Sequence, residues 1–445
     1  MLEEREYSGE WWIPAKPDEK IKGKLTFNQK DGARLNLEKA FTQLPITILG
    51  QSTPIGVKIT LQDCIAKDPN QFWEGFLGSP YQVFSHRVFL GGHFSQPEDA
   101  SFLSCHCQLS NLFEWLWKSG IDWKGEDLNE FNIAYKRPKT ISINIKPELK
   151  IKIDFNYSIK GNFLYEELKI KQHAIVAFYH SPKENIDEYL KLMHHFRNFL
   201  CLATQESTYP QTIVGITDVN PDSSLVEIFY QLDTSPTFVE TDVFNSLFSF
   251  KDIEYKFDTC LKNWYTKYEM LEPICQLYFG SYYGRFVYVD LKFLSLVQAL
   301  ESYHRIISSN EELPKPEHQT RINNILNAVP INYRSWLKYK LKYSNEPTLQ
   351  KRLQDLFNKF NCSINTLVPN QEVFIRKIVD TRNYMAHRDV NLKNKTVSNK
   401  ELFVITERLR ILVETCLLNE IGFNLDEIKS ILCKRYERRL RAYEK

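Results

Sequence analysis

The segment VFIRKIVDTRNYMAHRDV, residues 373–390, contains the side chains best suited to chemistry on a phosphate. Arg382 comes five positions before His387, and Asn383 follows the arginine directly. A guanidinium binds phosphate through paired hydrogen bonds, and an imidazole exchanges protons near neutral pH. The same residues can also be inert, because a helical arginine is commonly solvated and a histidine at a helix end often caps the last carbonyls.

Spacing by itself does not single out this segment. An arginine followed after four to six residues by a histidine is expected about once by chance in a chain of this composition. A second match is present, Arg87 and His93. It lies in an aromatic stretch with a Gly-Gly pair in the strand-like half, where nothing orders both side chains towards one phosphate. The Arg382 match lies at the end of an amphipathic helix in a basic region, and we expect the site there.

The helical register sets a constraint on this candidate site. Asn383 and His387 are four residues apart and share a helix face, whereas Arg382 lies about 140° from His387 around an ideal helix. Either the helix loosens near His387 or a second subunit completes the site. Asp380 and Arg388 could tune the site or simply face solvent.

The elements upstream are mostly strands. Alternating apolar residues over 149–159 predict a half-buried strand, and shorter alternations occur at 21–27, 35–37 and 141–145. Helical spacing over 183–205 predicts a helix packed on this sheet. The aromatic segment 205–285 has no clear periodicity. We predict a β-sandwich or barrel-like domain with added helices over residues 1–285.

From Val289 the apolar period becomes 3.6 and stays helical to the end. Ser398 with Glu401 and Asn424 with Glu427 have the spacing of helix-capping pairs. About six helices are expected in a compact bundle. The chain is therefore predicted to be α+β, with an all-α domain over residues 286–445.

Charge and composition limit the function. The net charge is +2, but residues 281–445 carry 28 Lys and Arg against 18 Asp and Glu, while the first 280 residues carry 29 against 37. Such asymmetry is compatible with a polyanionic partner for the helical part, or equally with two solvated surfaces that differ in charge. The nine cysteines lack the spacing of a disulfide framework and are expected to be reduced. Without a signal sequence or an apolar membrane span, we expect a cytoplasmic protein.

Other clusters support weaker hypotheses. Cys105-His106-Cys107 suggests metal binding, but one intervening residue is awkward for chelation, so neither a metal nor a cofactor is expected. Glu301 and His304 share a helix face that could approach the motif helix, as a supporting pair or as a buried structural one. The terminal KRYERRLRAYEK interleaves basic residues with Tyr436 and Tyr443, a pattern compatible with RNA stacking or with a solvated helix end.

The motif and its surroundings resemble the HEPN superfamily, and in particular the HEPN domain of ApeA-like anti-phage defence proteins. The similarity rests on LSLVQALESYHRI (294–306) and IVDTRNYMAHRD (378–389). GEWWIPAKPDEKIKGKLTF (9–27) and LNLEKAF (35–41) are similar to the N-terminal domain of those proteins. Together the resemblances span most of the chain, with a looser match in the middle.

The resemblance implies a metal-independent endoribonuclease in abortive infection, with two HEPN domains paired in a homodimer or higher homo-oligomer. RNA supplies its own nucleophile, the 2′-hydroxyl, so His387 would act as general acid or base and Arg382 would hold the phosphate. Asn383 would orient His387 or the ribose, and the product would be a 2′,3′-cyclic phosphate. We expect an RNA loop such as that of a tRNA as substrate, a phage-derived trigger, and a sensing or regulatory role for residues 1–285. The alternative is a catalytically silent HEPN module that binds RNA, a nucleotide or a partner protein.

Overall fold

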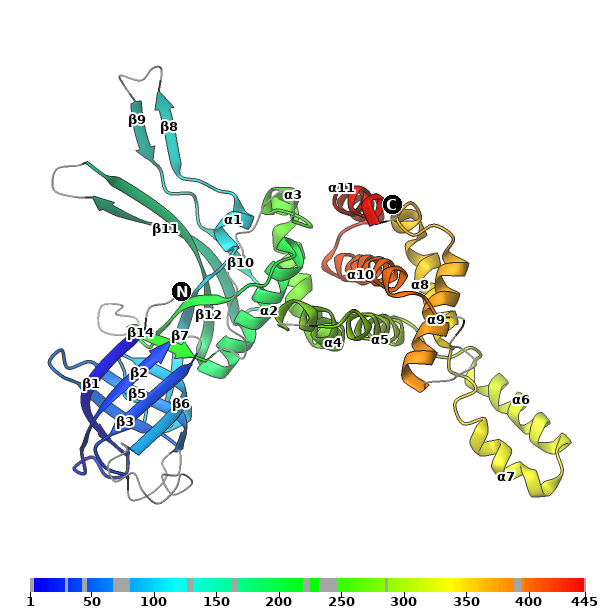
Figure 1. The fold of residues 1–445 in the computed structure, drawn as a ribbon, viewed down its shortest axis with the longest axis horizontal. Coiled ribbons are helices and arrows are strands. Elements are labelled where there is room, and N and C mark those ends of the chain that lie inside the picture. The colour runs from blue at the N-terminus through cyan, green and yellow to red at the C-terminus, as the bar shows by residue number, and fades with distance from the viewer. Residues whose placement is uncertain are drawn as a thin grey trace. The chain divides into compact units, whose positions relative to one another are not determined.

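The computed structural model forms two compact units, residues 1–254 and 255–445 (Figure 1). It describes all residues except 1–3, 29–30, 42–45, 67–80, 126–130, 162–165, 219–224, 232–245, 285–286, 388–393, 395 and 444–445. The first unit is strand-rich and the second is helical, so the predicted α+β class is confirmed.

The first unit is built on antiparallel strands that follow the alternation of apolar residues. Its strands are β1 (Arg5–Trp12), β2 (Ile21–Asn28), β3 (Gly32–Leu37), β4 (Ile48–Ser52), β5 (Lys58–Ala66), β6 (Tyr81–Leu90), β7 (Ser101–Leu109), β8 (Ile121–Gly125), β9 (Phe131–Tyr135), β10 (Ile141–Asn144), β11 (Leu149–Gly161), β12 (Leu168–Asn185), β13 (Pro210–Ile216) and β14 (Leu225–Tyr230). The strands predicted at 21–27, 35–37, 141–145 and 149–159 correspond to β2, β3, β10 and β11.

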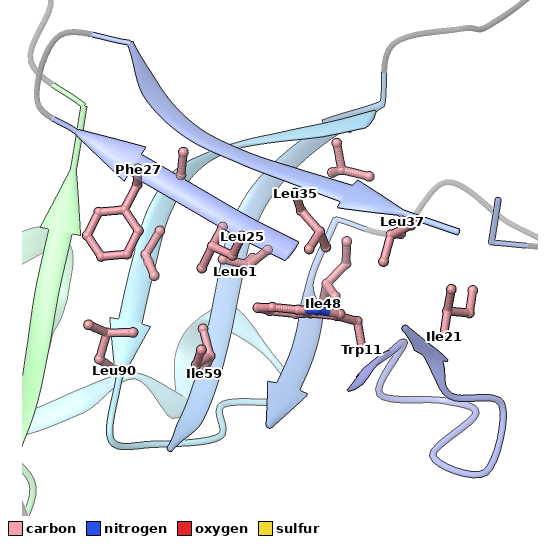
Figure 2. Close-up of a cluster of buried hydrophobic side chains, with 13 residues drawn as sticks. Trp11, Ile21, Leu25, Phe27, Leu35, Leu37, Ile48, Ile59, Leu61 and Leu90 are labelled. Carbon is pink, nitrogen blue, oxygen red and sulfur yellow. The ribbon is translucent and has the colours of Figure 1, made fainter. Parts of the chain in front are cut away.

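Six of these strands close into a barrel. Along the sheet the order is β6-β3-β2-β1-β4-β5, and β5 pairs again with β6. The barrel interior is filled by apolar side chains around Trp11, which is fully buried (Figure 2). A Cβ atom at Gly50 on β4 would lie 2.3 Å from the Trp11 ring, so the indole packs directly on the β4 backbone. Of the predicted sandwich or barrel, the structure has the barrel.

The sheet continues beyond the barrel because β6 has two neighbours along one edge. Its first half pairs with β3 and its second half with β14, which leads on to β13, β7, β12, β11 and β10. Helix α2 (Ile186–Thr204), predicted at 183–205, packs on β12 and β7. The Tyr189 hydroxyl donates to the Phe102 carbonyl at 3.1 Å. The strands β8 and β9 form a separate hairpin, and α1 (Leu112–Leu116), α3 (Phe250–Ile253) and the short 3-10 helix Pro97–Asp99 complete the unit.

The second unit is a helical bundle with one projecting pair of helices (Figure 1). After the short 3-10 helix Glu254–Lys256 at the unit boundary, its helices are α4 (Phe257–Tyr283), α5 (Val289–Ile307), α6 (Lys315–Ala328), α7 (Ile331–Lys340), α8 (Leu349–Ile364), α9 (Gln371–His387), α10 (Asn399–Ile421) and α11 (Leu425–Tyr443). Seven of them, α5 to α11, lie in the stretch expected to hold about six. Both predicted capping pairs are present, with Ser398 accepting from the Glu401 N–H and Asn424 and Glu427 bonded reciprocally.

The boundary between the units lies between residues 254 and 255, earlier than the 285/286 division drawn from periodicity. The difference comes from α4, which occupies the aromatic segment that periodicity left unassigned. Helix α4 packs against α5 and α10 and so belongs to the helical unit. Aromatic residues of α4 such as Trp264 and Tyr278 are buried. A helix covered on several sides lacks a simple apolar stripe, which is why periodicity did not reveal α4.

Candidate active site

Helix α9 carries the motif, and its buried face fixes where each motif residue points. Phe374, Ile378 and Thr381 are buried at i, i+4 and i+7 where α9 packs on α8 and α5. Measured from Ile378 around an ideal helix, Arg382 lies at about 40° and His387 at about 180°. The observed exposure agrees, since Arg382 is half-buried and His387 is exposed. The arginine therefore starts beside the bundle core, and the histidine faces away from it.

The Arg382 side chain is held by two neighbours. Its Nη1 donates to Asn383 Oδ1 at 3.2 Å, and its Nη2 lies 3.9 Å from Glu301 Oε2 on α5. The Arg382 side chain remains 31% exposed, so the guanidinium can still reach a ligand. The arginine and the asparagine are thus joined within one chain, although the ideal helix separates them by about 100°.

His387 is the last residue of α9, which stays helical up to that point. Up to His387 the helix does not loosen, and residues 388–393 after it lie outside the described part of the chain. Among the described residues, no hydrogen bond or ion pair joins His387 to Arg382 or Asn383. Arg388, the other residue expected near the helix end, lies outside the described residues. One chain therefore assembles the arginine and asparagine and leaves the imidazole free of both.

Glu301 connects Arg382 to a longer chain of charges. Its Oε1 lies 3.6 Å from Arg305 Nη2, one turn further along α5. Arg305 in turn donates to Glu346 at 2.9 Å, in the segment before α8. Of the two expected supporting residues on this face, Glu301 is the one placed beside the motif.

His304 faces α8 and forms a buried structural cluster. Arg352 Nη1 donates to His304 Nδ1 at 3.1 Å, and His304 Nε2 lies 3.2 Å from Asp355 Oδ2. Because an arginine can only donate, Nδ1 accepts and the ring proton sits on Nε2. Burial lowers the pKa of His304, the Asp355 bond opposes this, and the nearby Arg352 charge lowers it further. Of its two expected roles, the geometry favours the buried structural pair.

Asp380 lies on the outer side of α9, about 200° from Ile378 on an ideal helix. Its side chain is half-buried. Within the part of the chain that the structure describes, no hydrogen bond or ion pair connects it to Arg382, Asn383 or His387. A tuning role for Asp380 therefore has no contact to support it.

The second Arg–His match has a different environment. Arg87 on β6 forms ion pairs with Asp63 and Asp187, and His93 Nε2 donates to the Gly50 carbonyl at 2.8 Å. Both side chains are engaged in holding the barrel and its neighbours together. Each residue has its own partners, and no contact joins the two in the described part of the chain.

The Cys105-His106-Cys107 cluster is packed in the sheet. Both thiols are buried on β7, and burial raises the pKa of each. His106 lies 3.2 Å from the Ser104 hydroxyl and tilts against the Tyr179 ring. Among the described residues, no group of three or more His, Cys, Asp or Glu side chains is arranged to hold a metal ion.

The structure does not support base stacking on Tyr436 in the terminal segment, and it shows exposed aromatic residues elsewhere in the helical unit. Tyr436 is buried and donates to the Glu414 carboxylate on α10, so it cannot stack on a base. Exposed aromatic and basic side chains instead gather on α7 and the turn that follows it. Sequence reasoning missed this surface, although the run YRSWLKYKLKY (333–343) shows the same interleaving of aromatic and basic residues.

Comparison with protein families agrees with this two-part architecture. Residues 6–264 match the family described as ApeA N-terminal domain 1, and residues 294–427 match Apea-like HEPN. No curated protein and no solved structure matches the chain significantly. In the described part of the chain, no helix is long and apolar enough to cross a membrane.

Proposed function

The chain belongs to the ApeA family, and we propose that it is an anti-phage defence protein whose helical unit cleaves RNA without a metal ion. An Apea-like HEPN domain is typical of nucleases of this defence class. The observation that carries the proposal is the half-buried Arg382, held by Asn383 and Glu301 on the same helix end as an exposed His387.

The proposed reaction is a transesterification within the RNA. The 2′-hydroxyl oxygen attacks the adjacent phosphorus, the bond from phosphorus to the 5′-oxygen breaks, and a 2′,3′-cyclic phosphate and a 5′-hydroxyl remain. His387 takes the 2′-hydroxyl proton or delivers a proton to the leaving oxygen. Arg382 donates to the phosphate oxygens and offsets the charge that develops on them.

Two copies of α9 would complete this site. Because His387 points away from the bundle and contacts neither Arg382 nor Asn383 among the described residues, one chain presents its groups on different sides of the helix. Pairing two chains about a two-fold axis would bring both motifs into one cleft. We therefore propose a homodimer as the active form, with an RNA loop such as that of a tRNA as substrate, because unpaired bases are accessible to side chains. A phage-derived trigger would act through the strand-rich unit.

The test is cleavage of total cellular RNA by the purified full chain in EDTA, with analysis of the fragment ends. We expect fragments ending in 2′,3′-cyclic phosphate, and a loss of at least about a hundred-fold in rate for His387→Ala and for Arg382→Ala. The second Arg–His match supplies matched controls, because Arg87→Ala and His93→Ala change the same residue types at similar spacing in the other unit.

The outcomes separate the enzyme from a binding module. Cleavage that persists in His387→Ala, or that requires a metal ion, would contradict the mechanism. If the full chain cuts no RNA even after lysate from phage-infected cells is added, the catalytically silent module that binds RNA, a nucleotide or a protein becomes the better account.

A further inference from the structure

The helices α6 and α7 form a projecting pair, which we call the aromatic arm and define as residues 315–344. The arm extends away from the other helices of its unit (Figure 1). No residue of α6 or of α7 is buried. Such exposure is unusual for helices that carry large apolar side chains, and it marks the arm as an interaction surface.

The aromatic residues of the arm share one face of α7. On an ideal helix Tyr333, Trp336 and Tyr339 fall within an arc of about 120°, with Lys340 inside it. Their exposed fractions are 57%, 60% and 75%. Leu337, which is less exposed, lies to the side of this arc. The rings therefore form a row that faces solvent.

The charge of the arm is strongly positive. It contains six Lys and Arg residues and one acidic residue, Glu317. Arg334 is engaged at the α6–α7 connection, where its guanidinium donates to the carbonyls of Val329 and Asn327. Lys338 and Lys340 are both exposed on α7, and Lys340 falls within the arc of the rings whereas Lys338 lies on the other side of the helix. A polyanion with planar groups complements this surface.

The base of the arm is fixed to the bundle beside the candidate active site. Asn345 bonds to the N–H and the carbonyl of Leu313 at 3.0 and 2.9 Å, which ties the two ends of the arm together. The next residue, Glu346, accepts from Arg305 at 2.9 Å. Arg305 also lies 3.6 Å from Glu301, the carboxylate next to Arg382. The arm and the motif helix are thus joined by one chain of ion pairs.

We propose that the aromatic arm binds single-stranded RNA, with bases stacked on Tyr333, Trp336 and Tyr339 and the backbone attracted to the neighbouring lysines. This proposal rests on the proposed function and extends it, since it names the surface that holds the substrate. Stacking on aromatic rings beside basic groups is how proteins bind single strands without reading their sequence. Pairing of two arms would instead place like charges opposite each other, because a two-fold contact uses the same patch twice.

The test measures binding separately from cleavage. His387→Ala in the full chain serves as the parent, so that a short unstructured fluorescein-labelled RNA stays intact while its anisotropy is recorded. Adding Trp336→Ala and Tyr339→Ala should weaken binding by about ten-fold or more. Trp336→Phe should retain most of the affinity, since a ring remains. Trp123→Ala is the matched control, because Trp123 on β8 is 66% exposed.

The lysines give a second readout. Lys338→Gln with Lys340→Gln should reduce the slope of log Kd against log salt concentration by about 0.7 for each charge that contacts the strand. The control variant, Trp123→Ala in the same His387→Ala parent, should keep the slope of the parent. Light scattering of each variant reports whether the arm instead joins two copies.

Each outcome decides the proposal. If the Trp336/Tyr339 variant binds as tightly as the parent, the arm proposal is wrong, while cleavage by the unsubstituted chain still supports the nuclease. If that variant changes from dimer to monomer with RNA affinity unchanged, the arm joins copies and the proposal is also wrong. If the parent binds no RNA and the unsubstituted chain cuts none, both proposals fail.

Discussion

The guanidinium of Arg382 on α9 and the carboxylate of Glu301 on α5 lie 3.9 Å apart. The same carboxylate is 3.6 Å from Arg305, so Glu301 is shared by two cations. At these distances Glu301 can set the direction of the Arg382 side chain without neutralising it fully. It would also compete with a phosphate for the same guanidinium.

Neutralising Glu301 should separate binding from catalysis. In Glu301→Gln we expect RNA to bind as tightly as before or more tightly, because Arg382 loses a competing anion. The cleavage rate at saturating RNA should fall by about ten-fold or more, because the guanidinium is less well positioned. Single-turnover kinetics checks this. Glu372→Gln, at an exposed acidic residue in the first turn of α9, is the control. Equal losses in both variants would contradict the positioning role.

Replacing His304 should lower stability and leave cleavage nearly intact. His304→Gln weakens the hydrogen bond that the buried Arg352 donates to residue 304, and it should lower the free energy of unfolding by about 1–3 kcal/mol. The cleavage rate at saturating RNA should stay within about two-fold of the original, since His304 contacts α8 and not the motif. Thermal unfolding followed by far-UV circular dichroism gives the stability. Asp355→Asn breaks the same cluster from the other side and should behave alike. A large loss of cleavage with unchanged stability would contradict the structural role.

Acid should destabilise α2. Burial, with the nearby His194, lowers the pKa of the buried His195 to about 3. The unfolded chain binds a proton at the His195 ring below about pH 6.5. The free energy of unfolding should therefore decrease as the pH falls from about 6.5 to 4, by up to about 1.4 kcal/mol per pH unit for His195.

Hydrogen exchange of α2 peptides at pH 7 and pH 5, corrected for the intrinsic exchange rate, measures this effect. His195→Gln should reduce the loss of protection between the two pH values. His86→Gln, at an exposed position on β6, should leave it unchanged. Protection that does not depend on pH in the original chain would rule out the linkage.

The buried Glu414 should be a stability determinant of the helical unit. Tyr278 and Tyr436 both donate to its carboxylate, with shortest distances of 2.8 Å, and Arg410 lies 3.7 Å away. Tyr436→Phe should cost about 1.5–3 kcal/mol, because hydrogen bonds to a buried charged group are strong. Urea unfolding followed by the helical circular dichroism signal measures the loss. Tyr339→Phe, at an exposed ring, should be neutral. An unchanged free energy of unfolding in Tyr436→Phe would contradict this assignment.

Local sequence patterns were sufficient to predict those elements whose structure depends only on residues within the same segment. The alternation at 149–159 predicted β11, and the Ser398 and Asn424 caps marked two helix starts correctly. These features depend on neighbours a few residues away. The amphipathic motif helix was also identified locally, and the family match agrees with the resemblance that its residues carry. The roles of Arg382, Asn383 and His387 remain predictions.

Only the tertiary structure decided which distant groups meet. Glu301 and His304 occupy the same face of α5, yet Glu301 lies beside Arg382 and His304 beside Arg352. No spacing rule separates them, because the choice depends on how α8 and α9 pack. Tyr436, a stacking candidate in sequence, is buried against Glu414, while the rings of the aromatic arm are exposed. The sequence determined the elements and the chemistry that they can carry. Packing between segments far apart in the chain decided which side chains are buried and which remain available to a ligand.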